Sequence, residues 1–167
     1  MDALLTEMNN RSQLDQAVCP EFVRKLLLAA MAASSVGDQR PWHFVVVEDP
    51  EMRKQMADIL QPFAHMLPQA PVALLVCGDP TLQKHAGFWV QDCAAAMQNI
   101  LIESRAQRLG AVWLRIYPIE GRVQNFRKLL DLPPQVIPFA VTPVGYPVEK
   151  SEPKCRYDES RVHFERW

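Results

Sequence analysis

The sequence feature that most constrains the fold is an uninterrupted run of six apolar residues, Val72 to Cys77, between Pro71 and Gly78. A strand with one face in water alternates apolar and polar side chains, whereas a strand covered on both faces is apolar throughout. The run therefore predicts a buried central β-strand. Such a strand needs other parts of the chain to cover each face of its sheet.

The segments before and after this strand have apolar residues at the spacing of helices and strands. Pro20 and Glu21 suit a first helical turn, and the apolar residues that follow recur at helical spacing. The patterns predict helices over residues 20–33, 49–60, 88–109 and 123–130, and strands over residues 44–47, 72–77, 111–116 and 137–144. This alternation predicts an α/β or α+β arrangement of helices around one sheet, in a single domain over residues 1–167.

The longest predicted helix carries apolar residues on more than one face. Ala94 and Met97 lie on one stripe, and Cys93 and Ile100 lie on another. We therefore expect this helix to be covered on most sides and to lie in a dimer interface.

Residues 148–167 form a C-terminal arm of different composition. The arm is polar and contains Pro153, yet it ends with Phe164 and Trp167, which a disordered tail rarely carries. We expect the two aromatic residues to anchor the arm, either along its own domain or on a partner subunit. The alternative is a loosely held tail.

Charge and residue spacing exclude several classes of function. A net charge of -1 and a pI near 6.4 give no basic face for a nucleic acid. No apolar run approaches the roughly 20 residues of a membrane helix, and the N-terminal residues lack the pattern of a signal peptide, so we predict a cytoplasmic protein without a membrane partner. The four cysteines and four histidines are scattered, so neither a metal site nor a disulfide framework is predicted.

The chain contains neither of the glycine-rich loops that commonly hold nucleotide phosphates. A phosphorylated cofactor would therefore have to be held by cationic side chains, aided by hydroxyl groups. The candidates are Arg11 and Ser12 near the N-terminus and Lys154 and Arg156 in the arm. Taken alone, each is a weak signal, since an arginine in a polar tail is most often solvated.

The order of several short motifs gives a resemblance. The sequence contains Arg11-Ser12, a polar loop ending in Arg40-Pro41-Trp42-His43-Phe44, a Pro118-Ile119-Glu120-Gly121 turn, Gly145-Tyr146-Pro147 and Lys154-Cys155-Arg156. Over nearly its whole length the chain resembles the short members of the nitroreductase family of flavoproteins. No one motif is decisive, whereas their order and spacing together are specific.

This resemblance implies an α+β fold with a central, mostly antiparallel sheet flanked by helices. It also implies a homodimer that holds FMN in the subunit interface. Such proteins pass hydride from NADH or NADPH through the flavin to a nitroaromatic, quinone or related small-molecule acceptor. Because the flavin carries the chemistry, no side chain is predicted to be catalytic.

The resemblance also assigns the cofactor-binding residues. The basic residues near the two ends of the chain would bind the phosphate. The polar loop would reach across the interface to the partner's flavin, and the amides of the turn would face N5 or O4 of the ring. The predicted FMN-binding residues are Asn10, Arg11, Ser12, Ser34, Ser35, Asp38, Arg40, Pro118, Ile119, Glu120, Gly121, Lys154 and Arg156.

Two further interpretations stay open beside this one. Asn10 and Leu14 stand where the family usually has basic residues, and Asp38 stands where asparagine is common. These differences motivate an alternative, an FMN-binding or flavin-sequestering protein of the same fold without efficient NAD(P)H turnover. A third interpretation is a specialised oxidation or ring fragmentation by the bound flavin. Trp42, Trp89 and Trp113 are expected in the core or an interface.

Overall fold

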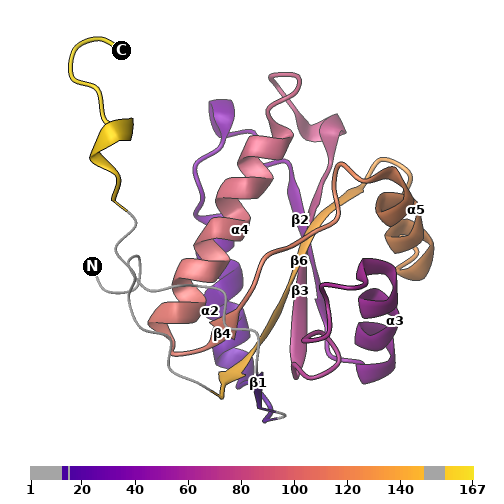
Figure 1. The fold of residues 1–167 in the computed structure, drawn as a ribbon. Helices are drawn as coiled ribbons and strands as arrows, with labels where there is room; N and C mark the ends of the chain where they lie inside the picture. Colours follow the sequence, from indigo (N-terminus) through magenta and orange to yellow (C-terminus); the bar gives the residue numbers. More distant parts are fainter. Residues whose placement is uncertain (1–12, 15, 149–156) are drawn as a thin grey trace.

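The structure is a computed structural model of the 167-residue chain, and it describes residues 13–14, 16–148 and 157–167 (Figure 1). Its centre is a six-stranded sheet in which every pairing is antiparallel. The strands are β1 (Gln13–Leu14), β2 (Trp42–Val47), β3 (Val72–Gly78), β4 (Gly110–Ala111), β5 (Leu114–Arg115) and β6 (Ile137–Pro147). The antiparallel pairing, with helices on both faces, makes the fold α+β and confirms that prediction.

The long strand β6 organises the sheet. The main order of strands is β1-β6-β3-β2, and β4 and β5 pair with β6 beside this path. β6 is 11 residues long, so it can pair with β3 along one edge and with β1, β4 and β5 along the other. The sequence pattern predicted an end at Val144, but Gly145 pairs with β4, and Tyr146 and Pro147 pair with β1. These partners extend the strand past the predicted end.

Two pairs of helices cover the sheet, one pair on each face (Figure 1). They are α2 (Pro20–Met31) and α4 (Trp89–Ala106) on one face, and α3 (Pro50–Leu60) and α5 (Glu120–Leu129) on the other. Short 3-10 helices stand at η1 (Val36–Asp38), η2 (Pro80–Leu82) and η3 (Glu159–Arg161). The four predicted helices are therefore confirmed, with different ends.

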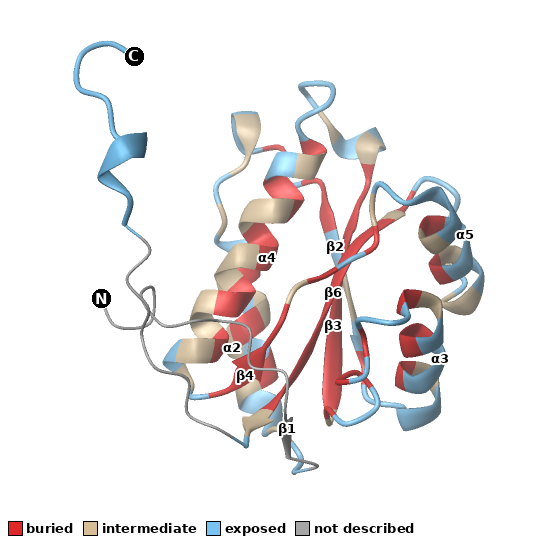
Figure 2. Ribbon diagram, viewed as in Figure 1, coloured by how far each residue is buried: buried red, intermediate tan, exposed pale blue. Residues whose placement is uncertain are grey.

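The central strand β3 is buried along its whole length, as its apolar run predicted (Figure 2). Side chains of a strand alternate between the two faces of the sheet. Leu74 and Val76 accordingly belong to the cluster under α2 and α4, whereas Leu75 and Cys77 belong to the cluster that α3 and α5 cover. One strand thus supplies side chains to both hydrophobic cores.

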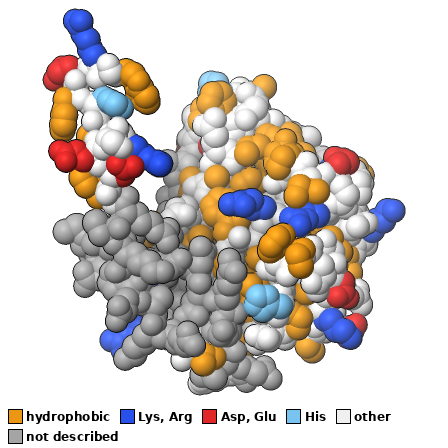
Figure 3. Space-filling view, viewed as in Figure 1, with side chains coloured by type: hydrophobic (Ala, Val, Ile, Leu, Met, Phe, Trp, Pro, Cys, Tyr) orange, Lys and Arg blue, Asp and Glu red, His pale blue; other side chains and the backbone are white. Residues whose placement is uncertain are grey.

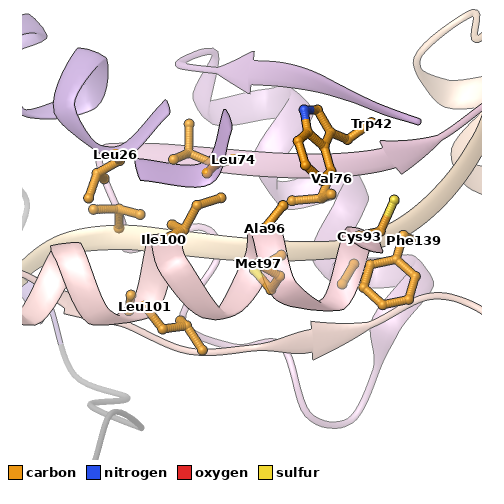
Figure 4. Close-up of a cluster of buried hydrophobic side chains, with 14 of the residues drawn as sticks. Leu26, Trp42, Leu74, Val76, Cys93, Ala96, Met97, Ile100, Leu101 and Phe139 are labelled. Carbon is orange, nitrogen blue, oxygen red and sulfur yellow. The ribbon is translucent and has the colours of Figure 1, made fainter. Parts of the chain in front are cut away.

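Helix α4 packs against the sheet with its apolar residues. Figure 4 shows Leu74 and Val76 of β3 facing Ile100 and Ala96 of α4, while Leu101 points to another side of the helix. Ala96 and Ile100 are fully buried, and Leu101 is 4% exposed, so the helix buries more than one face, as predicted. Its place in a dimer interface stays a prediction.

Several other predicted boundaries also differ from the structure. The helix predicted over residues 88–109 ends at Ala106, because the chain turns back at Arg108, which has a left-handed φ of 59°. The strand predicted over residues 111–116 is two short pieces, since only the segments 110–111 and 114–115 pair with β6. Helix α5 begins at Glu120, three residues before the predicted start at Val123, so the last two residues of the predicted turn belong to the helix.

The described part of the C-terminal arm, residues 157–167, is exposed throughout. Phe164 is 84% exposed and Trp167 is fully exposed. Figure 2 shows this segment apart from the sheet and helices. The described residues of the same chain therefore do not cover the two aromatic side chains.

Gly78, the last residue of β3, provides the first prediction. A Cβ atom at this position would lie 2.2 Å from Cε3 of the buried Trp89 ring. Gly78→Ala should therefore lower the free energy of unfolding by about 1–3 kcal/mol, the usual range for an overpacked core. Urea unfolding of the FMN-free protein measures this. Gly121→Ala is the control, since its Cβ would meet nothing within 4 Å, and equal stability of the two variants would contradict the prediction.

Candidate functional site

The polar loop Ser34–Arg40 joins α2 to β2 and has an unusual backbone. Gly37, Asp38 and Arg40 have left-handed φ values of 56°, 52° and 47°. Residues other than glycine rarely adopt this conformation, which costs roughly 1–2 kcal/mol per residue. The Arg40 amide donates to the Ser35 hydroxyl oxygen over 3.1 Å, and the Asp38 amide donates to the Ser35 carbonyl over 3.1 Å. Ser35 thus accepts from the amides of both non-glycine residues of the loop that have a left-handed φ.

A buried carboxylate anchors the same loop to α4. Asp92, in the first turns of α4, is 3% exposed and accepts from the Val36 amide over 3.0 Å and from Gln39 Nε2 over 2.5 Å. Gln39 is 6% exposed, and its Oε1 accepts from the amides of Lys84 and His85 over 3.0 and 3.1 Å. The loop, α4 and residues 84–85 are therefore joined by one hydrogen-bonded chain.

The two charged candidates of this loop neutralise one another. Arg40 donates from Nε to one Asp38 oxygen over 2.6 Å and from its terminal nitrogen to the other over 2.9 Å. Both side chains are exposed, and an exposed pair of this kind contributes at most about 1 kcal/mol to stability. The negative charge of Asp38 is thus not presented alone to a ligand.

The second candidate segment is the turn Pro118–Gly121, which leads into α5. The helical hydrogen bonds start with the amides of Arg122 and Val123, both of which donate to the Ile119 carbonyl. The Glu120 and Gly121 amides therefore lie in the turn where helical amides lack an intrahelical acceptor. The space beside Gly121 is open, and Ile119 is 48% exposed. A planar ring with acceptor atoms fits such a turn.

Aromatic residues support the turn from the core. Tyr117, the residue before it, contacts Trp89 edge to face at 4.9 Å between ring centroids. Trp113 contacts Phe139 in the same way at 5.8 Å. Trp42 and Trp89 are 8% and 7% exposed, and Trp113 packs against the same core. The prediction that these tryptophans lie in the core or an interface is confirmed for Trp42 and Trp89, which are buried in the core, and Trp113 is partly buried against it.

The loop and the turn lie on different sides of α4 in Figure 1, near the end of the helix that contains Trp89. Among the described residues, no hydrogen bond or ion pair joins the two segments. The structure therefore brings together Ser34, Ser35, Asp38 and Arg40 as one group, and Pro118 to Gly121 as another. The remaining candidates, Asn10, Arg11, Ser12, Lys154 and Arg156, lie outside the described residues.

Sequence analysis missed an open cavity beside the loop. It has a volume of about 460 Å³ and is lined by Leu27, Met31, Arg40, Trp42, His43 and Phe44. It also missed Gln39 and Asp92, whose contact spans 53 residues of sequence. The available signal for Asp92 was an acidic residue at helical spacing from Ala96 and Ile100, four and eight positions further along the same stripe.

Asp79, directly after β3, is a second buried carboxylate near the loop. Burial by itself would raise its pKa, but bonds from the Thr81 hydroxyl and amide, together with nearby His43, bring the pKa below the ordinary value. Its own amide donates to the Pro41 carbonyl over 2.7 Å. Asp79 therefore stabilises the start of η2 and the backbone beside β2.

The face of the molecule drawn in Figure 3 shows no large patch of one charge. Figure 3 shows Lys and Arg side chains scattered among hydrophobic and uncharged ones on the face in view. No group of three or more His, Cys, Asp or Glu side chains within residues 13–14, 16–148 and 157–167 could hold a metal ion. None of the helices described is both long and apolar enough to cross a membrane.

Comparison with known proteins gives one consistent result. The nitroreductase family model matches residues 60–146. A Methanothermobacter thermautotrophicus protein named "Putative NADH dehydrogenase/NAD(P)H nitroreductase" is 44% identical and is matched over 100% of this chain and 87% of its own length. A crystal structure of a Parabacteroides distasonis protein with the same name has a TM-score of 0.93 at 41% identity and covers 99% of this chain and 96% of its own.

A third similar protein is described together with a ligand. It is a "putative nitroreductase in complex with FMN" from Desulfovibrio desulfuricans. Its crystal structure has a TM-score of 0.83 at 26% identity and covers 99% of this chain and 95% of its own. At this identity the likeness extends beyond the fold to a recognisable sequence similarity.

The lowered pKa of Asp79 predicts a pH-dependent contribution to stability. The folded carboxylate binds a proton less readily than the unfolded one, so its contribution is full above the ordinary pKa of 3.8 and is lost as pH falls through the lowered value. Asp79→Asn should lower the free energy of unfolding at about pH 7 by roughly 1–2 kcal/mol, and by less at about pH 3. Urea unfolding at both pH values measures this, and an equal difference at both would contradict it.

Proposed function

This chain belongs to the nitroreductase family, and we propose that it is an FMN-dependent oxidoreductase. In this proposal, hydride passes from NADH or NADPH through the flavin to a small-molecule acceptor such as a nitroaromatic compound or a quinone. The observation that carries the proposal is the Pro118–Gly121 turn, with its first-turn amides beside open space. The similar protein in complex with FMN supports the choice of cofactor.

The flavin, when bound, supplies the redox chemistry, and the residues of the turn bind and orient it. The amides of Glu120 and Gly121 are suited to donate to N5 or O4 at the edge of the ring. They also stand at the N-terminus of α5, where the helix dipole favours negative charge. Donors fixed in this way stabilise added electron density without a proton from a side chain. We therefore assign no catalytic acid or base.

We assign the phosphate group to residues at the two ends of the chain. Arg11 and Ser12, with Asn10 beside them, would supply donors from the N-terminal segment. Lys154 and Arg156 would supply cations from the arm. A guanidinium and an ammonium group bind phosphate without a glycine-rich loop, which agrees with the lack of such a loop in the sequence.

We further propose that the protein works as a homodimer. Leu28 and Met31 on α2 are each 51% exposed, and Val46 on the outer strand β2 is 39% exposed. The aromatic residues Phe164 and Trp167 of the arm are also uncovered. A second copy would cover these apolar surfaces, and its flavin would meet the Ser34–Arg40 loop. The composite site then takes the loop from one subunit and the turn from the other.

The alternative is an FMN-binding protein of the same fold without efficient turnover. Asn10 and Leu14 favour it, because they replace two cations near the proposed phosphate position. Asp38 favours it less, since Arg40 neutralises its charge. The choice between the two functions therefore depends on whether the nicotinamide reduces the bound flavin.

An anaerobic titration tests the proposed function directly. The purified full chain with added FMN should show flavin absorbance, NADH or NADPH should bleach it, and a nitroaromatic or quinone should restore it. Protein that stays colourless after FMN is added and the excess is removed by gel filtration would overturn the proposal. Bound FMN that neither nicotinamide reduces would instead establish the alternative.

The proposed role of the arm is tested by oligomeric state. Replacing Phe164 and Trp167 together by alanine should raise the dimer dissociation constant by at least about tenfold, since buried aromatic anchors contribute strongly to interfaces. Sedimentation velocity over a range of concentrations measures the change. Phe63→Ala is the control, because Phe63 is an exposed aromatic residue of the domain itself. A monomeric wild-type protein, or an unchanged constant in the double variant, would contradict this role.

A further inference from the structure

The chain of hydrogen bonds through Asp92 and Gln39 has a fixed direction. An ionised carboxylate only accepts, so Asp92 requires a donor from both Val36 and Gln39. Gln39 must then present Nε2 to Asp92 and Oε1 to the amides of Lys84 and His85. Every donor in this series of hydrogen bonds meets an acceptor.

No other arrangement of these groups satisfies all four bonds. If the Gln39 amide were reversed, Oε1 would face the Asp92 carboxylate, and Nε2 would face two further donors. Asp92 is 3% exposed and Gln39 is 6% exposed, so solvent is largely kept from satisfying a broken bond. In the described residues, the carboxylate receives only neutral donors. Its shortest hydrogen bond, 2.5 Å, comes from Gln39, which is a residue of the loop.

The anchored residues lie within the strained part of the loop. Gln39 stands between Asp38 and Arg40, whose φ values are left-handed, and Val36 precedes Gly37, which is left-handed as well. A strained backbone persists only where its surroundings determine it. Besides the local bonds of Ser35, the bonds through Asp92 and Gln39 tie this segment to the rest of the domain. Lys84 adds one exposed bond from Nζ to the Gly37 carbonyl over 3.1 Å.

We propose that Asp92 is a positioning residue of the flavin site: through Gln39 and Val36 it holds the Ser34–Arg40 loop in the conformation that contacts the cofactor. This inference rests on the proposed binding of FMN beside the loop. Asp92 itself does not touch the flavin. Its loss lowers the fraction of molecules with a binding-competent loop, and the apparent affinity falls by that fraction.

The directionality of the bonds allows an exchange experiment. Asp92→Asn leaves an amide donor opposite Gln39 or Val36, and Gln39→Glu places a second carboxylate against Asp92. Each single variant should weaken FMN binding by about tenfold or more.

Combining the two substitutions restores a complete set of donors and acceptors. The amide introduced at position 92 can accept from Val36 through its oxygen and donate through its nitrogen to the carboxylate introduced at position 39. That carboxylate can also accept from the amides of Lys84 and His85. The double variant should therefore bind FMN within about threefold of the wild type.

Two measurements on the purified full chain carry the test. Quenching of flavin fluorescence gives the dissociation constant of FMN, and hydrogen exchange of residues 34–40 in the FMN-free protein reports the loop alone. The single variants should exchange faster in this segment, and the double variant should be protected again. Asp79→Asn is the matched control, since it makes the same substitution at a carboxylate 5% exposed that bonds to Thr81 instead of the loop.

The outcomes separate this inference from the proposed function. Asp92→Asn with wild-type FMN affinity, or a double variant no better than the single ones, would overturn the positioning role. An equal loss of affinity in Asp79→Asn would also overturn it, because loss of stability alone would then explain the result. A wild-type chain that binds no FMN would overturn the proposed function, while the exchange pattern of residues 34–40 would still show whether Asp92 holds the loop.

Discussion

The fold depends on the burial of β3 on both of its faces. Leu74 and Val76 pack under α2 and α4, and Leu75 and Cys77 pack under α3 and α5, so the same strand joins two hydrophobic cores. Burial raises the pKa of the Cys77 thiol to about 12, and the group therefore stays neutral and packs as a small apolar side chain. Each core is stable only with the other in place, because β3 cannot lose one cover without exposing apolar surface to water.

The two cores occupy both faces of the sheet, and the two segments proposed to bind the cofactor are connections between elements. These connections are the Ser34–Arg40 loop, between α2 and β2, and the Pro118–Gly121 turn, which leads from β5 into α5. The loop has left-handed residues and is tied to α4 by a buried carboxylate, whereas the turn has no residue with a left-handed φ and leads into a helix. The rigid core determines where each segment stands, and its own polar groups determine its conformation.

The spacing of apolar residues predicted the structural features that depend on residues close together in the sequence. It indicated the central strand and the four helices, because each follows from the spacing of apolar residues. It did not indicate the end of α4 or the break between β4 and β5, which depends on pairing with the distant strand β6. It also did not indicate the bond between Gln39 and Asp92, since polar residues far apart in sequence carry no shared period.

The two candidate segments are both joined to the first turns of α4. The loop is held there by Asp92, and the turn is joined to the same end of the helix through Tyr117 and Trp89. In Figure 1 they lie on different sides of that helix. If one FMN contacted the loop and the turn of the same chain, it would have to extend around α4 and its buried side chains. The proposed homodimer would avoid this, because each copy would supply the segment that the other's site lacks.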